Sequence, residues 1–331
     1  MRITTLCCQG FSGAPVPGGT PGTVLDMQLV TLAAIEAARD LVAPVIRHTT
    51  VDRCESLSRI AQRPVLLKHE ERQRAGPFKI RGAYNHIARY LSGDLSGAHS
   101  GTRPTGGAAE VVAASAGNHA QGVALAASLL GVRSTIFMPA TAPLPKIEAT
   151  RDYGATIELV DTGFDGALDA ALAHANASGS HFVSPFEDAD VIAGQGTLGL
   201  ELAAQAEDAE VVIVPVGGGG LIAGIAVAMR ALRPSCRIVG VEAEGAASMT
   251  AALAAGGPVA LDRLDTMADG ISNKRVGELT LAHTQALVDD VVTVTEEEIS
   301  HALLLLAERA KVVVEPAGAT PLAALLAGKV A

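Results

Sequence analysis

Short runs of β-branched and other apolar residues alternate along this chain with alanine- and leucine-rich stretches whose apolar positions recur at helical spacing. The short runs predict strands at 64–68, 110–115, 133–139, 156–160, 211–216 and 237–242. The longer stretches predict helices at 27–42, 117–130, 144–153, 166–178 and 221–232. Strands that are apolar throughout and are followed by helices are typical of a parallel sheet covered on both faces. The predicted fold class is therefore α/β.

Two long stretches, Val111–Val132 and Val211–Met229, contain no Asp, Glu, Lys or Arg. A membrane-spanning helix needs about 20 mostly apolar residues with few interruptions. Polar residues such as Asn118 and His119 interrupt the first stretch, and Pro215 with four consecutive glycines interrupts the second. Both stretches are therefore expected to be buried elements of a soluble protein.

The length of 331 residues suggests two domains. A net charge of −10 offers no basic surface for nucleic acid, so no nucleic-acid or membrane partner is expected. The four cysteines lack the spacing of a metal or iron–sulfur site, and a reduced cytoplasmic protein is the default.

Residues 1–26 are rich in glycine and proline and are expected to form a flexible leader. Residues 92–107 are expected to form an exposed loop.

The strongest local signal is the run Gly217–Gly220, which separates a β-branched stretch from an apolar helix. Consecutive glycines let backbone N–H groups converge, and the start of a helix favours an anion. Phosphate is the expected occupant, although a plain strand-to-helix turn is the simpler alternative. The spacing of Gly218, Gly220 and Ala223, with Glu242 after the next strand, also permits a Rossmann NAD-dependent oxidoreductase.

Two further segments carry candidate chemistry. Ser115–Gly122 again joins a strand to a helix, and its side chains and amides would suit a second anion such as a carboxylate. Helix capping is the alternative for Asn118 and His119. Lys79 lies among apolar residues, where burial would make it a usable amine nucleophile, although a surface lysine is the commoner case. Arg81 could be no more than a charge on the helix face.

Together these segments resemble the pyridoxal-phosphate enzymes of fold type II, most closely the threonine/serine dehydratases. The resemblance runs from about Met27 to the C-terminus. It rests on six segments in the family's order: KHEERQRAGPFKIRGAYN, VVAASAGNHAQGVALAA, MPATAPLPKIEATRDYGA, PFEDADVIAGQGT, VPVGGGGLIAGIA and VEPAGATPLAALLAG. The Rossmann alternative explains neither Lys79 nor the Ser115–Gly122 segment and is disfavoured.

The resemblance implies a role for each candidate residue. Lys79 would hold pyridoxal 5'-phosphate as a Schiff base and then act as the base at Cα. Phe78 would pack on the ring, Asn118 would bind its 3' oxygen, and Glu315 would lie near the ring. The cofactor phosphate would lie on Gly217, Gly218, Gly219 and Gly220, and the substrate carboxylate on Ser115, Asn118 and His119.

The implied activity is deamination by elimination of water, which converts L-threonine to 2-oxobutanoate and L-serine to pyruvate. Alternatives within the family are another hydroxy-amino-acid lyase and a serine racemase. Racemases of the family carry a second serine where Ala116 stands here, so elimination is favoured. No metal site is expected, because Ser248 occupies the position of an acidic cation ligand found in some members.

The resemblance also implies two domains with the cofactor in the cleft between them. Residues 27–88 and 184–331 would form the large domain and residues 89–183 the small one, in a homo-oligomer of two or four copies. Pro77 stands where the family usually has serine, and Glu71-Arg72 where it has Asp-Leu. The family normally continues beyond Ala331 to a serine that binds the pyridine nitrogen. Two alternatives follow: a truncated and weakly active or inactive member, or a gene model that ends early.

Overall fold

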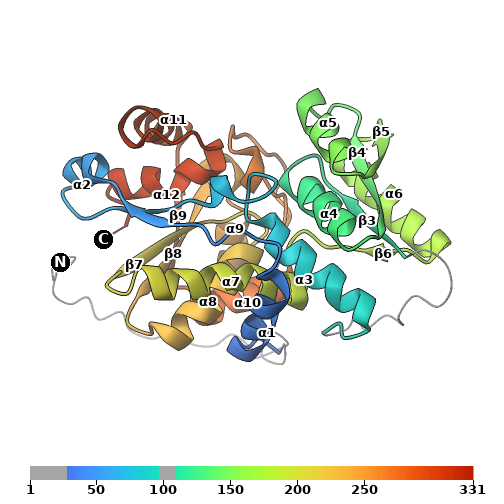
Figure 1. Ribbon diagram of the computed structural model, residues 1–331. Coiled ribbons are helices and arrows are strands. Elements are labelled where there is room, and N and C mark those ends of the chain that lie inside the picture. The colour runs from blue at the N-terminus through green and yellow to red at the C-terminus, as the bar shows by residue number, and fades with distance from the viewer. Residues whose placement is uncertain (1–27, 97–108, 331) are drawn as a thin grey trace.

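The computed structural model describes residues 28–96 and 109–330, so the expected leader and most of the expected 92–107 loop lie outside the described residues. Two parallel sheets flanked by helices form the body of the molecule (Figure 1). The chain enters through α1 (Leu32–Val42), whose first turn is capped by the Thr31 side chain. The expected α/β class is confirmed.

The first parallel sheet has four strands in the order β5-β4-β3-β6. All neighbours run parallel, with Val112 opposite Thr135 and Ile136 opposite Ile157. Its strands are β3 (Glu110–Ala114), β4 (Arg133–Pro139), β5 (Thr156–Val160) and β6 (His181–Phe182). The helices that follow them are α4 (Asn118–Leu129), α5 (Leu144–Asp152) and α6 (Gly163–Ser178). This sheet and its helices are called the four-stranded unit below.

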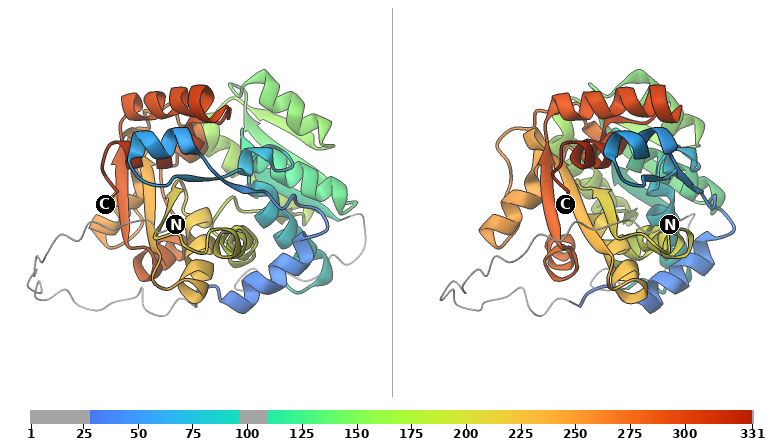
Figure 2. Two further views of the ribbon diagram at one scale, coloured as in Figure 1. Left: turned by 60° about the vertical axis from the view of Figure 1, so that its left-hand side comes forward. Right: turned by 90° about the vertical axis from the view of Figure 1, so that its left-hand side faces the viewer.

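The second parallel sheet has the order β7-β8-β9. Its strands are β7 (Val211–Pro215), β8 (Arg237–Ala243) and β9 (Asp290–Val294). Its helices are α7 (Ala189–Gln205), α8 (Gly220–Leu232), α9 (Ser248–Ala255), α10 (Glu278–Leu287), α11 (Glu296–Leu305) and α12 (Pro316–Leu326). Figure 2 shows this sheet edge-on with helices on both sides. It is called the three-stranded unit below.

The strand expected at 64–68 lies outside both parallel sheets. β1 (Val51–Arg53) and β2 (Leu66–Lys68) form a separate antiparallel pair, joined by α2 (Glu55–Ala61). The pair lies beside the three-stranded unit, where Leu57 and Val65 join its apolar core. Apolar content alone predicted this strand but could not identify its partner.

Helix α3 (Lys79–Ser92) connects the two units, because it packs on α4 of one and on α7 of the other (Figure 1). The predicted domain boundary at 88/89 falls inside α3, and the boundary at 183/184 lies one residue after the end of β6. Both boundaries stay predictions.

Candidate active site

Lys79 is the first residue of α3 and directly follows Phe78. Its Nζ donates to the carbonyl of Pro185 over 2.9 Å and lies 5.3 Å from the centre of the Phe78 ring. Burial lowers the pKa of Lys79 to about 8. At pH 7.5 about a quarter of such amines are neutral, against about one in a thousand at the usual lysine pKa. The group is therefore suited to act as a nucleophile or base.

Close helix contacts fix the backbone around Lys79. A β-carbon built on Gly122 of α4 would lie 3.1 Å from the Lys79 carbonyl carbon, and one on Gly194 of α7 would lie 2.6 Å from the Arg81 oxygen. The approach at Gly194 excludes a β-carbon, and the approach at Gly122 leaves little room for one. The glycines of α4 and α7 therefore determine how closely α3 is held.

Arg81 is completely buried, so it is not the simple helix-face charge that the sequence allowed. Its guanidinium donates to both oxygens of Glu70, over 2.9 and 2.8 Å, and to Glu201 over 2.7 Å. Lys68 donates to the other Glu201 oxygen over 2.5 Å. Two cations and two carboxylates thus balance inside the fold, two residues from Lys79. The sequence offered the four charges but no signal that they meet.

The glycine turn Gly217–Gly220 joins β7 to α8, as expected. Gly219 has a φ of +92°, which favours glycine. A β-carbon on Gly218 would lie 2.1 Å from the Phe186 ring, and one on Gly217 would lie 2.5 Å from the Asn273 side-chain oxygen. The turn therefore places backbone N–H groups at the start of α8 and leaves no room there for a side chain.

Pro185 and Phe186 link the lysine to this turn. The Pro185 carbonyl accepts from Lys79, and the next side chain lies against Gly218 and Gly220. Lys79 and the glycine turn lie 138 or more residues apart in the chain, and both contact the dipeptide Pro185–Phe186. Sequence reasoning gave no role to Phe186.

Asn118 begins α4, and Glu315 directly precedes α12. The Asn118 amide donates to the Glu315 carboxylate over 2.7 Å, so the structure brings these two predicted residues together. A β-carbon on Gly270 would lie 3.5 Å from that carboxylate. The contact joins the four-stranded unit to the three-stranded unit.

Ser115 and His119 lie on the same turn as Asn118. The Ser115 hydroxyl accepts from the Gly117 N–H over 3.2 Å. His119 is buried, and its Nε2 bonds to the Val183 carbonyl over 2.9 Å. Burial, with the nearby Lys79 charge, lowers the pKa of His119 to about 3. The ring is therefore neutral, and its Nε2 is already bonded to a backbone carbonyl. The donor that His119 can offer to a ligand is its backbone N–H in the first turn of α4.

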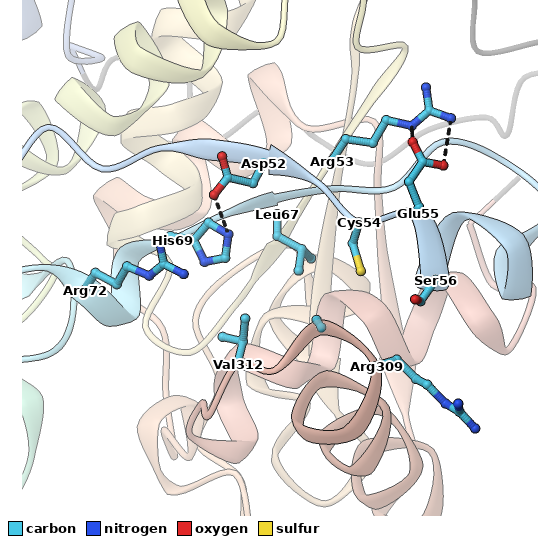
Figure 3. Close-up of a pocket in the computed structure, with 11 residues that line it drawn as sticks. Asp52, Arg53, Cys54, Glu55, Ser56, Leu67, His69, Arg72, Arg309 and Val312 are labelled. Atoms are coloured by element: carbon cyan, nitrogen blue, oxygen red, sulfur yellow. Dashed lines mark hydrogen bonds and ion pairs between the residues drawn. The ribbon is translucent and has the colours of Figure 1, made fainter.

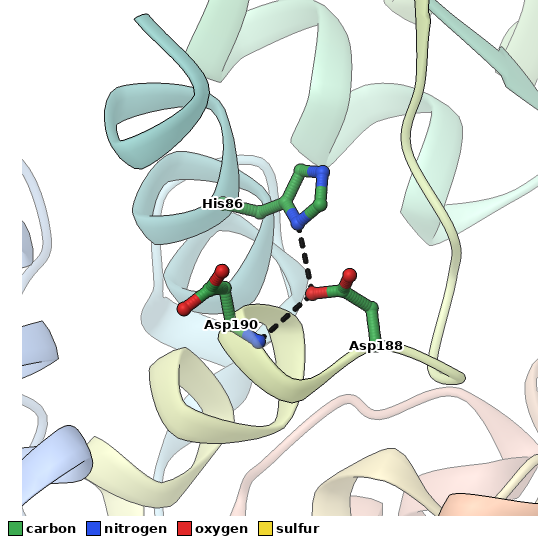
Figure 4. Close-up of side chains that lie close together, drawn as sticks. All are labelled: His86, Asp188 and Asp190. Atoms are coloured by element: carbon green, nitrogen blue, oxygen red, sulfur yellow. Dashed lines mark hydrogen bonds and ion pairs between the residues drawn. The ribbon is translucent and has the colours of Figure 1, made fainter. Parts of the chain in front are cut away.

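The segment from His181 to Asp188 receives several of these contacts. Besides the carbonyls of Val183 and Pro185, the His181 Nε2 lies 2.7 Å from the His86 Nε2. The other nitrogen of His86 bonds to Asp188, which caps α7, and Asp190 lies beside them (Figure 4). We call residues 181–188 the anchored segment, because α3, α4 and α7 all hold it.

Glu242 does not have the role that the Rossmann alternative required. It is completely buried and accepts from the N–H groups of Met249 and Thr250 at the start of α9, over 2.7 and 2.8 Å. Burial raises its pKa. Its carboxylate therefore caps a helix.

A separate cavity of about 260 Å³ lies between the β1–β2 pair and the turn before α12 (Figure 3). Two side-chain contacts, Arg53–Glu55 and His69–Asp52, lie along its β1–β2 side (Figure 3). It contains none of the predicted site residues. Its lining consists of Asp52, Arg53, Cys54, Glu55, Ser56, Leu67, His69, Arg72, Arg309, Ala310 and Val312.

Comparisons with known proteins show the family to which the chain belongs. Residues 42–331 match the family described as pyridoxal-phosphate dependent enzyme. An L-threonine ammonia-lyase of Thermotoga maritima is 46% identical over 298 residues, covering 90% of this chain and 71% of that protein. The catabolic L-threonine dehydratase TdcB of Escherichia coli K12 is 40% identical, covering 91% of this chain and 88% of that protein.

Solved structures give the same picture. A threonine deaminase of T.th. superposes with a TM-score of 0.82 at 38% identity, covering 90% of this chain and 93% of that one. Maize serine racemase superposes with a TM-score of 0.82 at 35% identity, covering 90% and 87%. Among residues 28–96 and 109–330, no helix combines the length and apolarity needed to cross a bilayer.

Proposed function

Because this chain belongs to the family of pyridoxal-phosphate dependent enzymes, we propose that it is an ammonia-lyase that eliminates water from L-threonine and L-serine. The products are 2-oxobutanoate or pyruvate, with ammonia. The observation that carries the proposal is the meeting of Lys79 and the glycine turn on Pro185–Phe186. The similarity to threonine ammonia-lyases supports the choice of substrate.

The residues present fit the cofactor. Lys79 supplies an amine of lowered pKa for its aldehyde, and Gly217–Gly220 supply N–H groups for its phosphate in a turn where a β-carbon would collide with neighbouring protein atoms. Asn118 and Glu315 would face its ring, and Phe78 would pack on it. When bound, the cofactor supplies an electron sink for the pair of electrons left at the substrate Cα.

The chain's own residues would then do the remaining work. The Lys79 Nζ takes the proton from Cα, which its lowered pKa favours near neutral pH. Ser115 and the first-turn N–H groups of Asn118 and His119 hold the substrate carboxylate. The buried His119 ring keeps the anchored segment in place through Val183.

The test is to follow 2-oxobutanoate formation from L-threonine by the holoenzyme, with Lys79→Ala and Lys79→Arg compared with Lys311→Arg, a change at an exposed lysine. We expect turnover to fall by at least about 1,000-fold in both Lys79 variants, as for removal of a catalytic base or nucleophile, and to stay unchanged in the control. Product formation that persisted in Lys79→Ala would refute the assignment.

Serine racemization is the second candidate, because maize serine racemase shares the fold at 35% identity. Ala116 supplies no hydroxyl for a second base on the opposite face of Cα. We therefore expect chiral chromatography to find pyruvate from L-serine and negligible D-serine. Comparable amounts of the two would favour the racemase.

We also propose that the enzyme acts in the cytoplasm as a homo-oligomer of two or four copies. Val313 is 84% exposed and Leu144 is 70% exposed, so another copy of the chain could cover these apolar side chains. Light scattering on the purified holoenzyme tests it, and a monomer at micromolar concentration would overturn it.

A further inference from the structure

A loop of the three-stranded unit, residues 268–277, forms one wall of the candidate active site. Gly270 faces the Asn118–Glu315 contact, and Ile271 and Asn273 lie against Gly217 of the glycine turn. The same loop thus touches the turn proposed for the phosphate and the pair proposed for the ring. We call residues 268–277 the wall loop.

Two ion pairs fasten the wall loop to the four-stranded unit. Lys146 of α5 pairs with Asp269 at one end of the loop, and Asp165 of α6 pairs with Lys274 at the other, over 2.9 Å. All four side chains are partly or largely exposed, at 27%, 58%, 70% and 50% in the order just given. Each pair is therefore worth little to overall stability.

The two pairs have opposite polarity, which gives them a specific effect. The four-stranded unit contributes a cation at one end and an anion at the other. In an arrangement that exchanged the two ends of the loop, Asp269 would meet Asp165 and Lys274 would meet Lys146. Like charges then repel. The pairs therefore favour one alignment of the wall loop against α5 and α6, the alignment in which Gly270 faces Asn118.

We propose that Lys146 and Asp165 are positioning residues for substrate binding, which fasten the wall loop across the site while the substrate carboxylate is held at the start of α4. This proposal rests on the proposed function for its substrate. Neither residue touches the reacting atoms. Their contribution is to the alignment of the two units, so it affects binding more than the chemical step.

The test uses charge reversal in the holoenzyme: Lys146→Glu, Asp269→Lys and the double variant. Each single reversal replaces attraction by repulsion, so we expect KM for L-threonine to rise about two- to fivefold, the range given by exposed pairs. We expect kcat to change by less than about twofold, and the double variant to regain the original KM. The matched control is Arg263→Glu, because the exposed Arg263–Asp265 pair lies within one loop and joins nothing across the units.

Hydrogen exchange of the peptide 266–277 gives a readout that needs no turnover. We expect faster exchange in both single variants and restored protection in the double variant, with no change in Arg263→Glu. If the original chain forms no 2-oxobutanoate or pyruvate, the proposed function fails, and the exchange result still decides the role of the pairs. Unchanged exchange and KM in the single variants, or a double variant no better than the singles, would overturn the proposal.

Discussion

Replacing Arg81 by methionine tests whether the buried charges of Arg81, Lys68, Glu70 and Glu201 stabilise α3, the helix that begins with Lys79. The variant removes three charge-assisted hydrogen bonds, two to Glu70 and one to Glu201, and a weaker one of 3.2 Å to Thr197. Glu70 and Glu201 would then share a single cation, Lys68, inside the protein.

Removing one partner from a buried ion pair costs about 3–5 kcal/mol, because a buried charge is left uncompensated. Since the total stability of a domain is about 5–15 kcal/mol, that loss is a large fraction of it. Arg81→Lys keeps the charge but cannot bond both Glu70 oxygens, so we expect a smaller loss of about 1–3 kcal/mol.

The assay is urea unfolding followed by circular dichroism, with Arg309→Met as a control at an exposed arginine. Burial alone would raise the pKa of Glu201, but Arg81 and Lys68 hold it below its usual value. That contribution is fully present above the usual glutamate pKa of 4.5 and is lost as the pH falls below it, so the deficit of Arg81→Met should be full at pH 7 and should shrink once the pH falls below about 4.5. A deficit under about 1 kcal/mol at pH 7, or one that does not depend on pH, would refute the reasoning.

Two substitutions and one pH series test the rest of the site. Gly194→Ala places a β-carbon 2.6 Å from the Arg81 oxygen, so thermal unfolding should show a loss of about 1–3 kcal/mol, whereas Gly257→Ala, with open space around it, should be nearly neutral. Asn118→Asp puts a second carboxylate beside Glu315, and titration monitored by absorbance should show cofactor affinity at least about tenfold weaker, with Asn118→Ala less affected. Capture of pyridoxal phosphate by the cofactor-free chain should speed up as the pH rises and level off above about 8, because Lys79 becomes neutral there; a rise continuing to about pH 10 in stopped-flow absorbance would contradict this.

Local sequence patterns predicted strands that consist mainly of β-branched and other apolar residues. The strands at 133–139 and 156–160 have the expected bounds, since their apolar runs end at turn-forming residues. β6 has only two residues, and β9 lies in a stretch with adjacent acidic residues, so neither gave a strand signal.

In the candidate site too, the sequence predicted local motifs but not contacts between distant residues. The glycine turn is encoded by four adjacent residues and was found directly. The Asn118–Glu315 contact joins residues 197 positions apart, so only the family resemblance suggested that they share a site. Arg81 is charged, and a charge is usually exposed, so its burial depends on Glu70 and Glu201, which tertiary structure brings to it.

The anchored segment holds His119 and Lys79 through main-chain oxygens, those of Val183 and Pro185. A substitution there leaves the carbonyl in place, whereas inserting or deleting one residue turns the following carbonyl to the other edge of the extended chain. Saturation mutagenesis of 183–185 would thus find tolerance to most side chains of suitable size, and single-residue deletions would abolish activity. When this enzyme is recombined with a relative, the number of residues in 183–185 must be preserved, whereas the identities of these residues can change.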